Sequence, residues 1–431
     1  MLNAAFAVYD ITPKIGDEIP GGFSPRISTG VIDPLEARAV AFRSHDSRQS
    51  LIVIGADAVS LRFETVEAAR KIISAKCGIP PRRILICASH THCGGPANSV
   101  LGTEKNDQYL LKVIDGLANA AIQAWDSTQP VTLQFGKKDC PGWGFNRRWV
   151  MKNGLHRTNP GKLNPDMVRP AGPTDPQVSF LLVKDTAGKP IGAIGNFTCH
   201  STVFWEEKFT PDYCYYWQKA LRSIYGEDFV LVFTNGACGD INQVDFTNGN
   251  SKEKGLPHAT IMGEALAKAS VEAVASSAVE AEPTLGWAGT DVELPLRIPS
   301  TEQLAADKAL VDSDAEWTSA KWQARDRLLL AKEYEGKNAT LCPVDVYQIG
   351  QALFAASSWQ PFCEFGLRLK SFSPERVVVA MLANGNVGYI PTEAAFIGGG
   401  YEPTLCRGSH HAPNAGEIIT NASLKLLRLF E

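Results

Sequence analysis

Short apolar runs alternate with amphipathic helical patterns along most of the 431-residue chain. Continuous apolar runs are typical of strands covered on both faces, and a 3.6-residue apolar period is typical of helices packed on a sheet. The alternation therefore predicts an α/β fold of layered mixed β-sheets flanked by helices. The expected strands are residues 39–42, 50–56, 83–88, 131–136, 178–184, 192–198, 229–234, 284–294, 342–349, 352–357, 376–382 and 388–391. The expected helices are residues 63–75, 107–125, 212–225 and 259–276.

Two segments depart from this alternation. Residues 141–173 are rich in Gly, Pro, Asn and Arg, which predicts a long loop of the kind that is commonly functional or disordered. Residues 301–334 form the most charged long helical stretch, which predicts a helical hairpin or a projecting insertion with a solvated, structural role. Since no internal repeat or linker interrupts the chain, we expect a single domain over residues 1–431.

Composition narrows the class of protein. Hydrophobic residues make up 44% of the chain and charged residues 20%, which are ordinary values for a soluble globular enzyme. The formal net charge of -4 gives no general electrostatic case for binding nucleic acid. The ten cysteines form no C-x-x-C pair, and several lie in apolar runs, so we expect buried free thiols and no disulfide framework.

Location can also be predicted from the apolar pattern. No apolar run approaches the ~20 residues that span a bilayer, so we expect no transmembrane segment. The first residues lack a basic stretch followed by an apolar one, which predicts a cytoplasmic protein, or a secreted one if a leader has been removed. Nothing in the sequence indicates the oligomeric state.

Two histidines follow the apolar strand expected at residues 83–88. In an extended backbone His90 and His92 point to the same side, and two glycines follow them closely. Because neutral imidazole is a common metal ligand, this pair predicts a metal site at a strand end. The alternative is a pair of histidines held in a hydrogen-bonded turn.

A third histidine and a Gly-rich turn also end strands. His200 follows the strand expected at residues 192–198, where it is either a ligand from a second strand end or a histidine satisfied within the core. Residues 234–242 form a turn in which glycines allow backbone N–H groups to approach a substrate oxygen. Asp240 in this turn is a candidate for orienting a ligand histidine, and the alternative is an ordinary connection between elements.

Three further polar residues stand near the expected C-terminal strands. Glu364 lies among apolar residues, where a buried carboxylate needs a partner or a cation, although a surface glutamate at a helix start is the alternative. Tyr389 closes a strand, and Tyr401 follows three glycines. A phenol can ligate a metal, donate a hydrogen bond to an oxyanion or pack as an ordinary aromatic.

Taken in order, these clusters resemble the neutral, non-lysosomal ceramidase family, and the resemblance spans nearly the whole chain. It begins with the Asp-Ile-Thr-Pro run at residues 10–13 and the Asp-Pro-Leu-Glu-Ala-Arg-Ala run at residues 33–39. The resemblance implies a ceramidase catalytic-domain-like fold and Zn²⁺ as cofactor. Since the chain ends about 30 residues after Tyr401, we expect the C-terminal immunoglobulin-like domain of ceramidases to be absent.

The resemblance implies a set of metal ligands in this chain. His90 is similar to the first zinc histidine of the family, in its His-Thr-His motif, and His200 is similar to the second. Glu364, in Pro-Phe-Cys-Glu-Phe, resembles the zinc glutamate of a Pro-Gly-Glu-Phe setting. Tyr389, in Gly-Tyr-Ile-Pro-Thr, resembles the zinc tyrosine.

The resemblance also implies three catalytic residues. His92 corresponds to the histidine beside the bound water, Arg147 to a substrate-binding arginine, and Tyr401 to a second active-site tyrosine. Two positions depart from the family pattern. Cys93 replaces the usual serine after the histidine pair, and Asn242 stands where ceramidases carry an active-site serine. A serine-nucleophile mechanism therefore lacks its residue, whereas a metal-activated water does not need it.

The predicted function is zinc-dependent hydrolysis of an N-acyl, ceramide-like amide by metal-activated water, acting on a small-molecule or lipid-like substrate. His92 is expected to act as general base, and Tyr401 and Arg147 to stabilise the oxyanion or hold a polar head group. Two alternatives remain open at this point. One is a zinc-dependent deacetylase or esterase acting on a sugar or other small acylated substrate, and the other is an inactive binding module.

Overall fold

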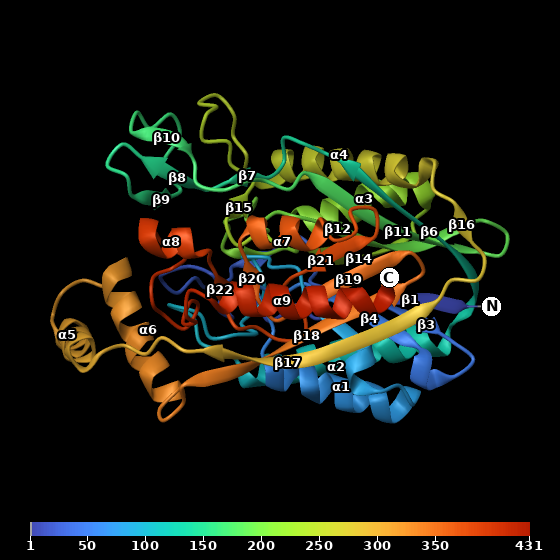
Figure 1. Cartoon of the computed structure of the whole chain (residues 1–431), viewed down its shortest axis with the longest axis horizontal. Coiled ribbons are helices and arrows are strands. Elements are labelled where there is room, and N and C mark those ends of the chain that lie inside the picture. The colour runs from blue at the N-terminus through green and yellow to red at the C-terminus, as the bar shows by residue number, and fades with distance from the viewer. Residues whose placement is uncertain (1) are drawn as a thin grey trace.

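A nine-stranded mixed sheet forms the centre of the computed structural model, which describes residues 2–431 (Figure 1). Its strands are β1 (Asn3–Asp10), β3 (Glu36–Arg43), β4 (Leu51–Ala56), β5 (Ile84–Ala88), β6 (Gln129–Asp139), β11 (Gln177–Asp185), β12 (Pro190–Phe197), β14 (Val230–Asn235) and β16 (Val279–Glu280). They pair in the order β14-β12-β11-β6-β1-β3-β4-β5, and β16 pairs with β6 off this path. The pairs β4·β5 and β12·β14 are parallel, so their carboxyl ends point the same way within each pair.

A second, four-stranded sheet packs on one face of the first. Its strands are β17 (Leu285–Pro295), β18 (Ala339–Ile349), β19 (Ala352–Ser357) and β21 (Val377–Ala380), in that order. Side chains of both sheets, such as Val53 from β4 and Phe354 from β19, share one buried cluster. Because side chains alternate along a strand, Ile54 of β4 points instead to the opposite face, among the residues packed under helices.

Helices cover the two outer faces. The first sheet carries α1 (Phe63–Cys77), α2 (Asp107–Asp126), α3 (Tyr213–Tyr225) and α4 (Gly255–Ala275), and the second carries α7 (Cys363–Lys370) and α9 (Ala415–Leu427). The result is four layers in the order helices, sheet, sheet, helices (Figure 1). The predicted α/β fold of layered mixed sheets flanked by helices is confirmed.

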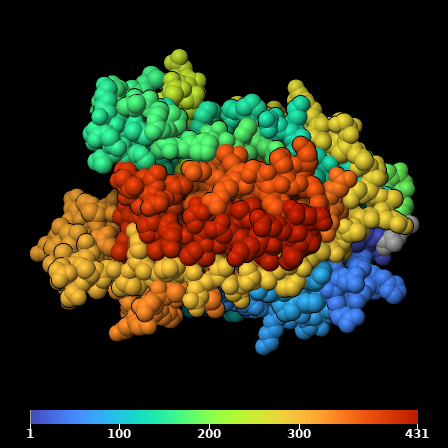
Figure 2. Space-filling view, viewed as in Figure 1, coloured from blue at the N-terminus to red at the C-terminus, as the bar shows by residue number. Residues whose placement is uncertain are grey.

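Two surface elements lie at one end of the molecule (Figure 2). The charged stretch forms the expected hairpin, α5 (Thr301–Asp312) and α6 (Ser319–Glu333). The segment expected to be a long loop instead contains a small sheet of β8 (Arg148–Met151), β9 (His156–Thr158) and β10 (Met167–Pro170). Strands of three or four residues are too short to show an apolar alternation, which explains why the sequence indicated a loop here.

Short elements complete the chain and carry part of the site. They are β2 (Gly30–Val31), β7 (Phe145–Asn146), β13 (Lys208–Phe209), β15 (Ile241–Asn242), β20 (Gln360–Pro361), β22 (Tyr389–Ile390), α8 (Glu393–Gly398) and the 3-10 turns Ser47–Gln49, Pro81–Arg83 and Arg428–Phe430. All ten cysteines lie in the described part of the chain, and each is buried as a free thiol, as predicted. Within residues 2–431, no helix is both long and apolar enough to cross a bilayer.

Candidate functional site

Three histidine side chains converge beside the ends of β5 and β12. Nitrogen atoms of His90, His92 and His200 all lie within 4.8 Å of one another. The Nε2 atoms of His90 and His92 are 3.4 Å apart, and the ring centroids of His90 and His200 are 4.5 Å apart. The three histidines predicted from the sequence are therefore brought together.

The backbone achieves this convergence by a turn and not by an extended strand. Strand β5 ends at Ala88, and His90 has a φ of 66°, in the left-handed region that residues other than glycine rarely occupy. The expectation that an extended backbone aligns His90 with His92 is thus corrected. A conformation of this kind costs free energy and commonly marks a functional position.

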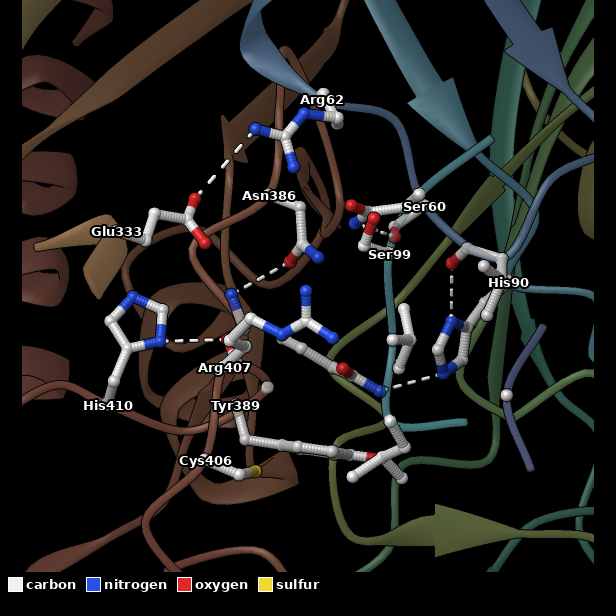
Figure 3. Close-up of a pocket in the computed structure, with 18 of the residues that line it drawn as sticks. Ser60, Arg62, His90, Ser99, Glu333, Asn386, Tyr389, Cys406, Arg407 and His410 are labelled. Atoms are coloured by element: carbon white, nitrogen blue, oxygen red, sulfur yellow. Dashed lines mark hydrogen bonds and ion pairs between the residues drawn. The ribbon is translucent and has the colours of Figure 1, made fainter. Parts of the chain in front are cut away.

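Backbone carbonyls fix the proton position on two of the rings. The Nδ1 of His90 donates to the Val59 carbonyl at 2.7 Å (Figure 3). The Nδ1 of His200 lies 2.6 Å from the Cys238 carbonyl and 2.9 Å from the Ile241 carbonyl. A carbonyl can only accept, so Nδ1 carries the proton in both rings and Nε2 presents a lone pair to the centre of the cluster.

Burial keeps the cluster neutral. It lowers the pKa of His90 to about 4, assisted by the positive charge of Arg147. The pKa values of His92 and His200 lie well below the usual value, first because of burial and then because of neighbouring histidines and Arg147. At neutral pH the three imidazoles are therefore in the form that binds metal ions or accepts a proton.

Gln360 joins the cluster, and the sequence reasoning missed it. Its amide Nε2 lies 2.7 Å from the Nε2 of His90 and 3.2 Å from the Nε2 of His200. Strand β20 pairs in parallel with β22, which places Gln360 opposite Tyr389. The only available signal was a polar residue three positions after the apolar strand that ends at Ser357.

Glu364 does not lie at the cluster, which corrects its assignment as a metal ligand. Helix α7 begins at Cys363, so Glu364 falls in its first turn, where its side chain is exposed. A carboxylate is favoured there by the unpaired N–H groups and the dipole of the helix. Glu364 lines a separate hollow next to Arg148 and His156, as the surface-glutamate alternative predicts.

Tyr389 and Arg147 extend the cluster. The Tyr389 hydroxyl is 3.3 Å from the Nε2 of His200 and accepts a hydrogen bond from Arg147 at 3.0 Å. Arg147 also donates to Glu402 at 2.9 Å and to the Gly239 carbonyl at 2.9 Å. The pKa of Tyr389 is raised by burial, so its phenol is protonated at neutral pH. The pKa of Arg147 is raised by Tyr389 and Glu402 despite its burial, so its charge is permanent.

The ring of Tyr401 packs against the ring of Tyr389. Their ring centroids are 5.8 Å apart in an edge-on arrangement, and Phe23 packs against Tyr401 at 5.4 Å. Burial raises the pKa of the Tyr401 phenol well above its usual value. Tyr401 is therefore a protonated phenol that lines the same hollows as His92, and its role as an oxyanion donor stays a prediction.

Asp240 does not orient a histidine. Its carboxylate accepts hydrogen bonds from the Asn146 amide and from the backbone N–H of Cys363, both at 2.7 Å. Burial raises its pKa to about 6. The turn that contains Asp240 acts on His200 through its carbonyls at Cys238 and Ile241 instead.

Two hollows open on either side of the cluster and share His92, Tyr389 and Tyr401 as a common wall. The first hollow is open to solvent, has about 850 Å³ of free space and is rich in polar groups, which include Ser60, Arg62, Asn98, Ser99, Glu333, Asn386 and Arg407. Several of these residues are drawn in Figure 3. The second hollow is also open to solvent and has about 1140 Å³ of free space, and its apolar lining includes Phe23, Trp205, Val244 and Phe246. A substrate that reaches the histidines thus meets a polar side and a more apolar side.

Comparison with known proteins agrees with the fold. The chain is 25% identical to the neutral ceramidase of Pseudomonas aeruginosa strain PAO1 over 225 residues, which are 48% of this chain and 31% of that protein. The chain is thus similar to a neutral ceramidase over about half of its own length. It therefore matches under a third of the length of this curated relative, and no protein-family model matches it.

Two solved structures have the same fold over almost the whole chain. The crystal structure of neutral ceramidase from Pseudomonas aeruginosa superposes with a TM-score of 0.73 at 18% identity, over 99% of this chain and 75% of that one. A structure of ceramidase complexed with C2 superposes with a TM-score of 0.74 at 16% identity, again over 99% of this chain and 75% of that one. Both layered sheets are therefore shared with this neutral-ceramidase-like fold.

Proposed function

We propose that the chain hydrolyses the amide bond of an N-acyl, ceramide-like substrate at a divalent metal centre, with Zn²⁺ as the ion. The observation that supports this most directly is the convergence of three neutral histidines on one point beside Arg147. The sequence similarity to a neutral ceramidase supports the choice of bond.

The nitrogen atoms fit a zinc ion. Zinc binds histidine nitrogen at about 2.0–2.1 Å, which places two tetrahedral ligand atoms about 3.3 Å apart. The Tyr389 hydroxyl is 3.3 Å from the Nε2 of His200, and the ligand nitrogens of His90 and His200 lie within 4.8 Å of one another. In residues 2–431, no Asp, Glu or Cys joins the three histidines within 4.8 Å, so the donor set is nitrogen-rich and lacks a carboxylate.

In this proposal His90, His200 and Tyr389 would hold the ion, and a bound ion would supply Lewis-acid polarisation of the scissile carbonyl and a more acidic water. His92 acts as general base, because its Nε2 faces the cluster and its ring lines both hollows. Because its pKa is low, the His92 ring is unprotonated at neutral pH. Its free lone pair can therefore accept a proton from a water, and the ring can then pass that proton to the leaving amine.

Two donors are available for the developing oxyanion. Arg147 carries a permanent charge, and burial keeps the phenol of Tyr401 protonated at neutral pH. Donors fixed in a buried site need little reorganisation during the reaction, which makes them effective in stabilising charge. Arg147 is further fixed by its ion pair with Glu402.

The two hollows support a substrate with one polar and one apolar part. The acyl chain would lie along Phe23, Trp205 and Phe246, and the amine-bearing part would face the polar side near Asn98 and Asn386. The predominantly polar lining of the first hollow also favours a second candidate, hydrolysis of a small N-acylated sugar or similar polar compound.

A substrate panel tests this function. Zinc-loaded and chelated protein are incubated with N-acyl sphingoid lipids of graded acyl length and with N-acetylated sugars, and release of amine is measured. Release from the lipids that depends on zinc is the expected result, with Glu364→Gln as a control that retains it. Release from the sugars alone would select the second candidate. Hydrolysis that survives full metal removal, or none in any arm, would overturn the proposal.

A further inference from the structure

Gln360 donates hydrogen bonds to the two imidazole nitrogens, on His90 and His200, whose lone pairs a metal ion would bind. Its amide nitrogen lies 2.7 Å from the Nε2 of His90 and 3.2 Å from the Nε2 of His200. Both Nε2 atoms are acceptors, because the Nδ1 atoms donate to backbone carbonyls. An amide NH₂ carries two hydrogens, which suffice for both rings. The side chain therefore faces the cluster with its nitrogen and not its oxygen.

A distance of 2.7 Å is a hydrogen bond and is too short for two ligands of one ion. Tetrahedral zinc separates its ligand atoms by about 3.3 Å. The same lone pair cannot accept a hydrogen bond and bind a cation at once. Metal binding must therefore break both bonds from Gln360, whose side chain is buried with 5% exposure.

The charges near the histidines also disfavour binding of a metal ion. Arg147 and Arg148 both pair with Glu402, so two cations share one carboxylate near the cluster. Among the described residues no carboxylate joins the three histidines. A dication would enter a site whose nearest charges are already positive on balance, which weakens its binding.

We propose that Gln360 competes with the metal ion for His90 and His200, so that this chain binds its ion weakly and reversibly and keeps an ordered, hydrogen-bonded site without it. This inference rests on the metal centre of the proposed function. It concerns the affinity of that centre, which the proposed function does not set.

Two substitutions distinguish a Gln360 side chain that competes with the metal ion from one that is a ligand of the ion. Gln360→Leu removes both donated hydrogen bonds and adds no ligand, whereas Gln360→Glu removes them and adds a negative charge. If Gln360 competes, zinc affinity rises in the order wild type, Gln360→Leu, Gln360→Glu. If the amide instead served as a ligand through its oxygen, Gln360→Leu would bind zinc more weakly than wild type.

The experiment is zinc titration of metal-free protein in competition with a chelator of known affinity, for wild type, both variants and the exposed control Glu364→Gln. We expect Gln360→Glu to bind zinc about tenfold or more tightly than wild type, since one charge contributes on this scale, and the control to match wild type. Without zinc, Gln360→Leu should unfold at a lower temperature than wild type, because it lacks two buried hydrogen bonds.

The results of the zinc titration can be told apart from those of the substrate panel. Weaker zinc binding by Gln360→Leu, or a gain below tenfold in Gln360→Glu, overturns the competition while the hydrolase function stands if zinc-dependent amine release is observed. If neither wild type nor any variant binds zinc, the metal centre and this inference both fail.

Discussion

At the scale of single residues, Gly21 determines where His92 can lie. Gly21 has a φ of 97°, and its carbonyl lies 3.3 Å from the Nδ1 of His92. A Cβ at this position would lie 2.4 Å from that same nitrogen. Since the ring is buried and His92 is the proposed base, only a residue without a side chain allows it to face the cluster.

Gly21→Ala should therefore lower kcat/KM by about 100-fold or more, because a positioned general base contributes about 10²–10⁴-fold to the rate. Zinc content should stay at the wild-type level, since His90 and His200 are not contacted. The matched control is Gly16→Ala, where φ is 100° but no atom lies within 4 Å of the added Cβ. Equal activity losses in the two variants would show that backbone strain, and not the position of His92, is responsible.

Asp212 offers a test of a buried carboxyl group. It caps α3, and its carboxylate accepts from the backbone N–H groups of Phe204 and Tyr213 at 2.8 and 2.7 Å. Burial raises its pKa to about 7, despite these hydrogen bonds. Its φ of 69° is one that Asn tolerates better than most residues.

The sign of the pH dependence follows from the raised pKa. Between about pH 4 and pH 7 the folded state holds a proton that the unfolded state has lost, so this group contributes stability at low pH that disappears as pH rises towards 7. Asp212→Asn cannot titrate. Its free energy of unfolding relative to wild type should therefore improve by a few kcal/mol from pH 4 to pH 7, measured by urea unfolding of metal-free protein. A constant difference across this range would contradict the assignment.

At the scale of elements, the α5–α6 hairpin forms part of the wall of the polar hollow. Glu333, at the end of α6, lines that hollow together with Tyr334. The hairpin is fixed by Asp326, which accepts from the backbone N–H and the Nε of Arg407 at 2.7 and 2.6 Å. Asp326 is 1% exposed, so this pair is buried, and its loss leaves Arg407 with only its longer contact to Glu104 at 3.4 Å.

Asp326→Asn should weaken the contact that joins the α5–α6 hairpin to Arg407. We expect a loss of stability of about 1–3 kcal/mol, a raised KM and faster proteolytic cleavage near α6, because a buried charge loses its closer partner. The control is Asp312→Asn, which breaks the exposed ion pair of Lys308 on α5 and should change stability by less than about 0.5 kcal/mol. An unchanged KM in Asp326→Asn would show that the hairpin does not contact the substrate.

The elements also show what the sequence could reveal. His90 and His200 were predictable, because each follows an apolar strand and strand ends commonly carry functional side chains. Glu364 and Gln360 could not be told apart, because the choice depends on the long-range pairing of β20 with β22 and on helix α7 starting at Cys363. The strands at residues 148–170 were missed because strands of three or four residues carry no periodic signal.

At the scale of the whole molecule, the site lies where the two sheets meet. His90 and His200 follow strands of the nine-stranded sheet, whereas Gln360 and Tyr389 belong to segments that follow strands of the four-stranded sheet. The backbone N–H of Ala88 also donates to the Leu382 carbonyl at 3.1 Å, which joins the end of β5 to the second sheet. An ion bound by His90, His200 and Tyr389 would link both sheets, so binding should stabilise the entire fold.

Zinc should accordingly raise the unfolding temperature. At a free concentration one hundred times the dissociation constant, a ligand that binds only the folded state contributes about 2.7 kcal/mol, or roughly 3 °C for a chain of this length. His200→Ala should abolish this rise, since it removes one ligand from the nine-stranded sheet, while the exposed variant Glu364→Gln should keep it. Calorimetry that showed two separate transitions, with zinc shifting only one, would mean that the sheets unfold independently and that the centre does not join them.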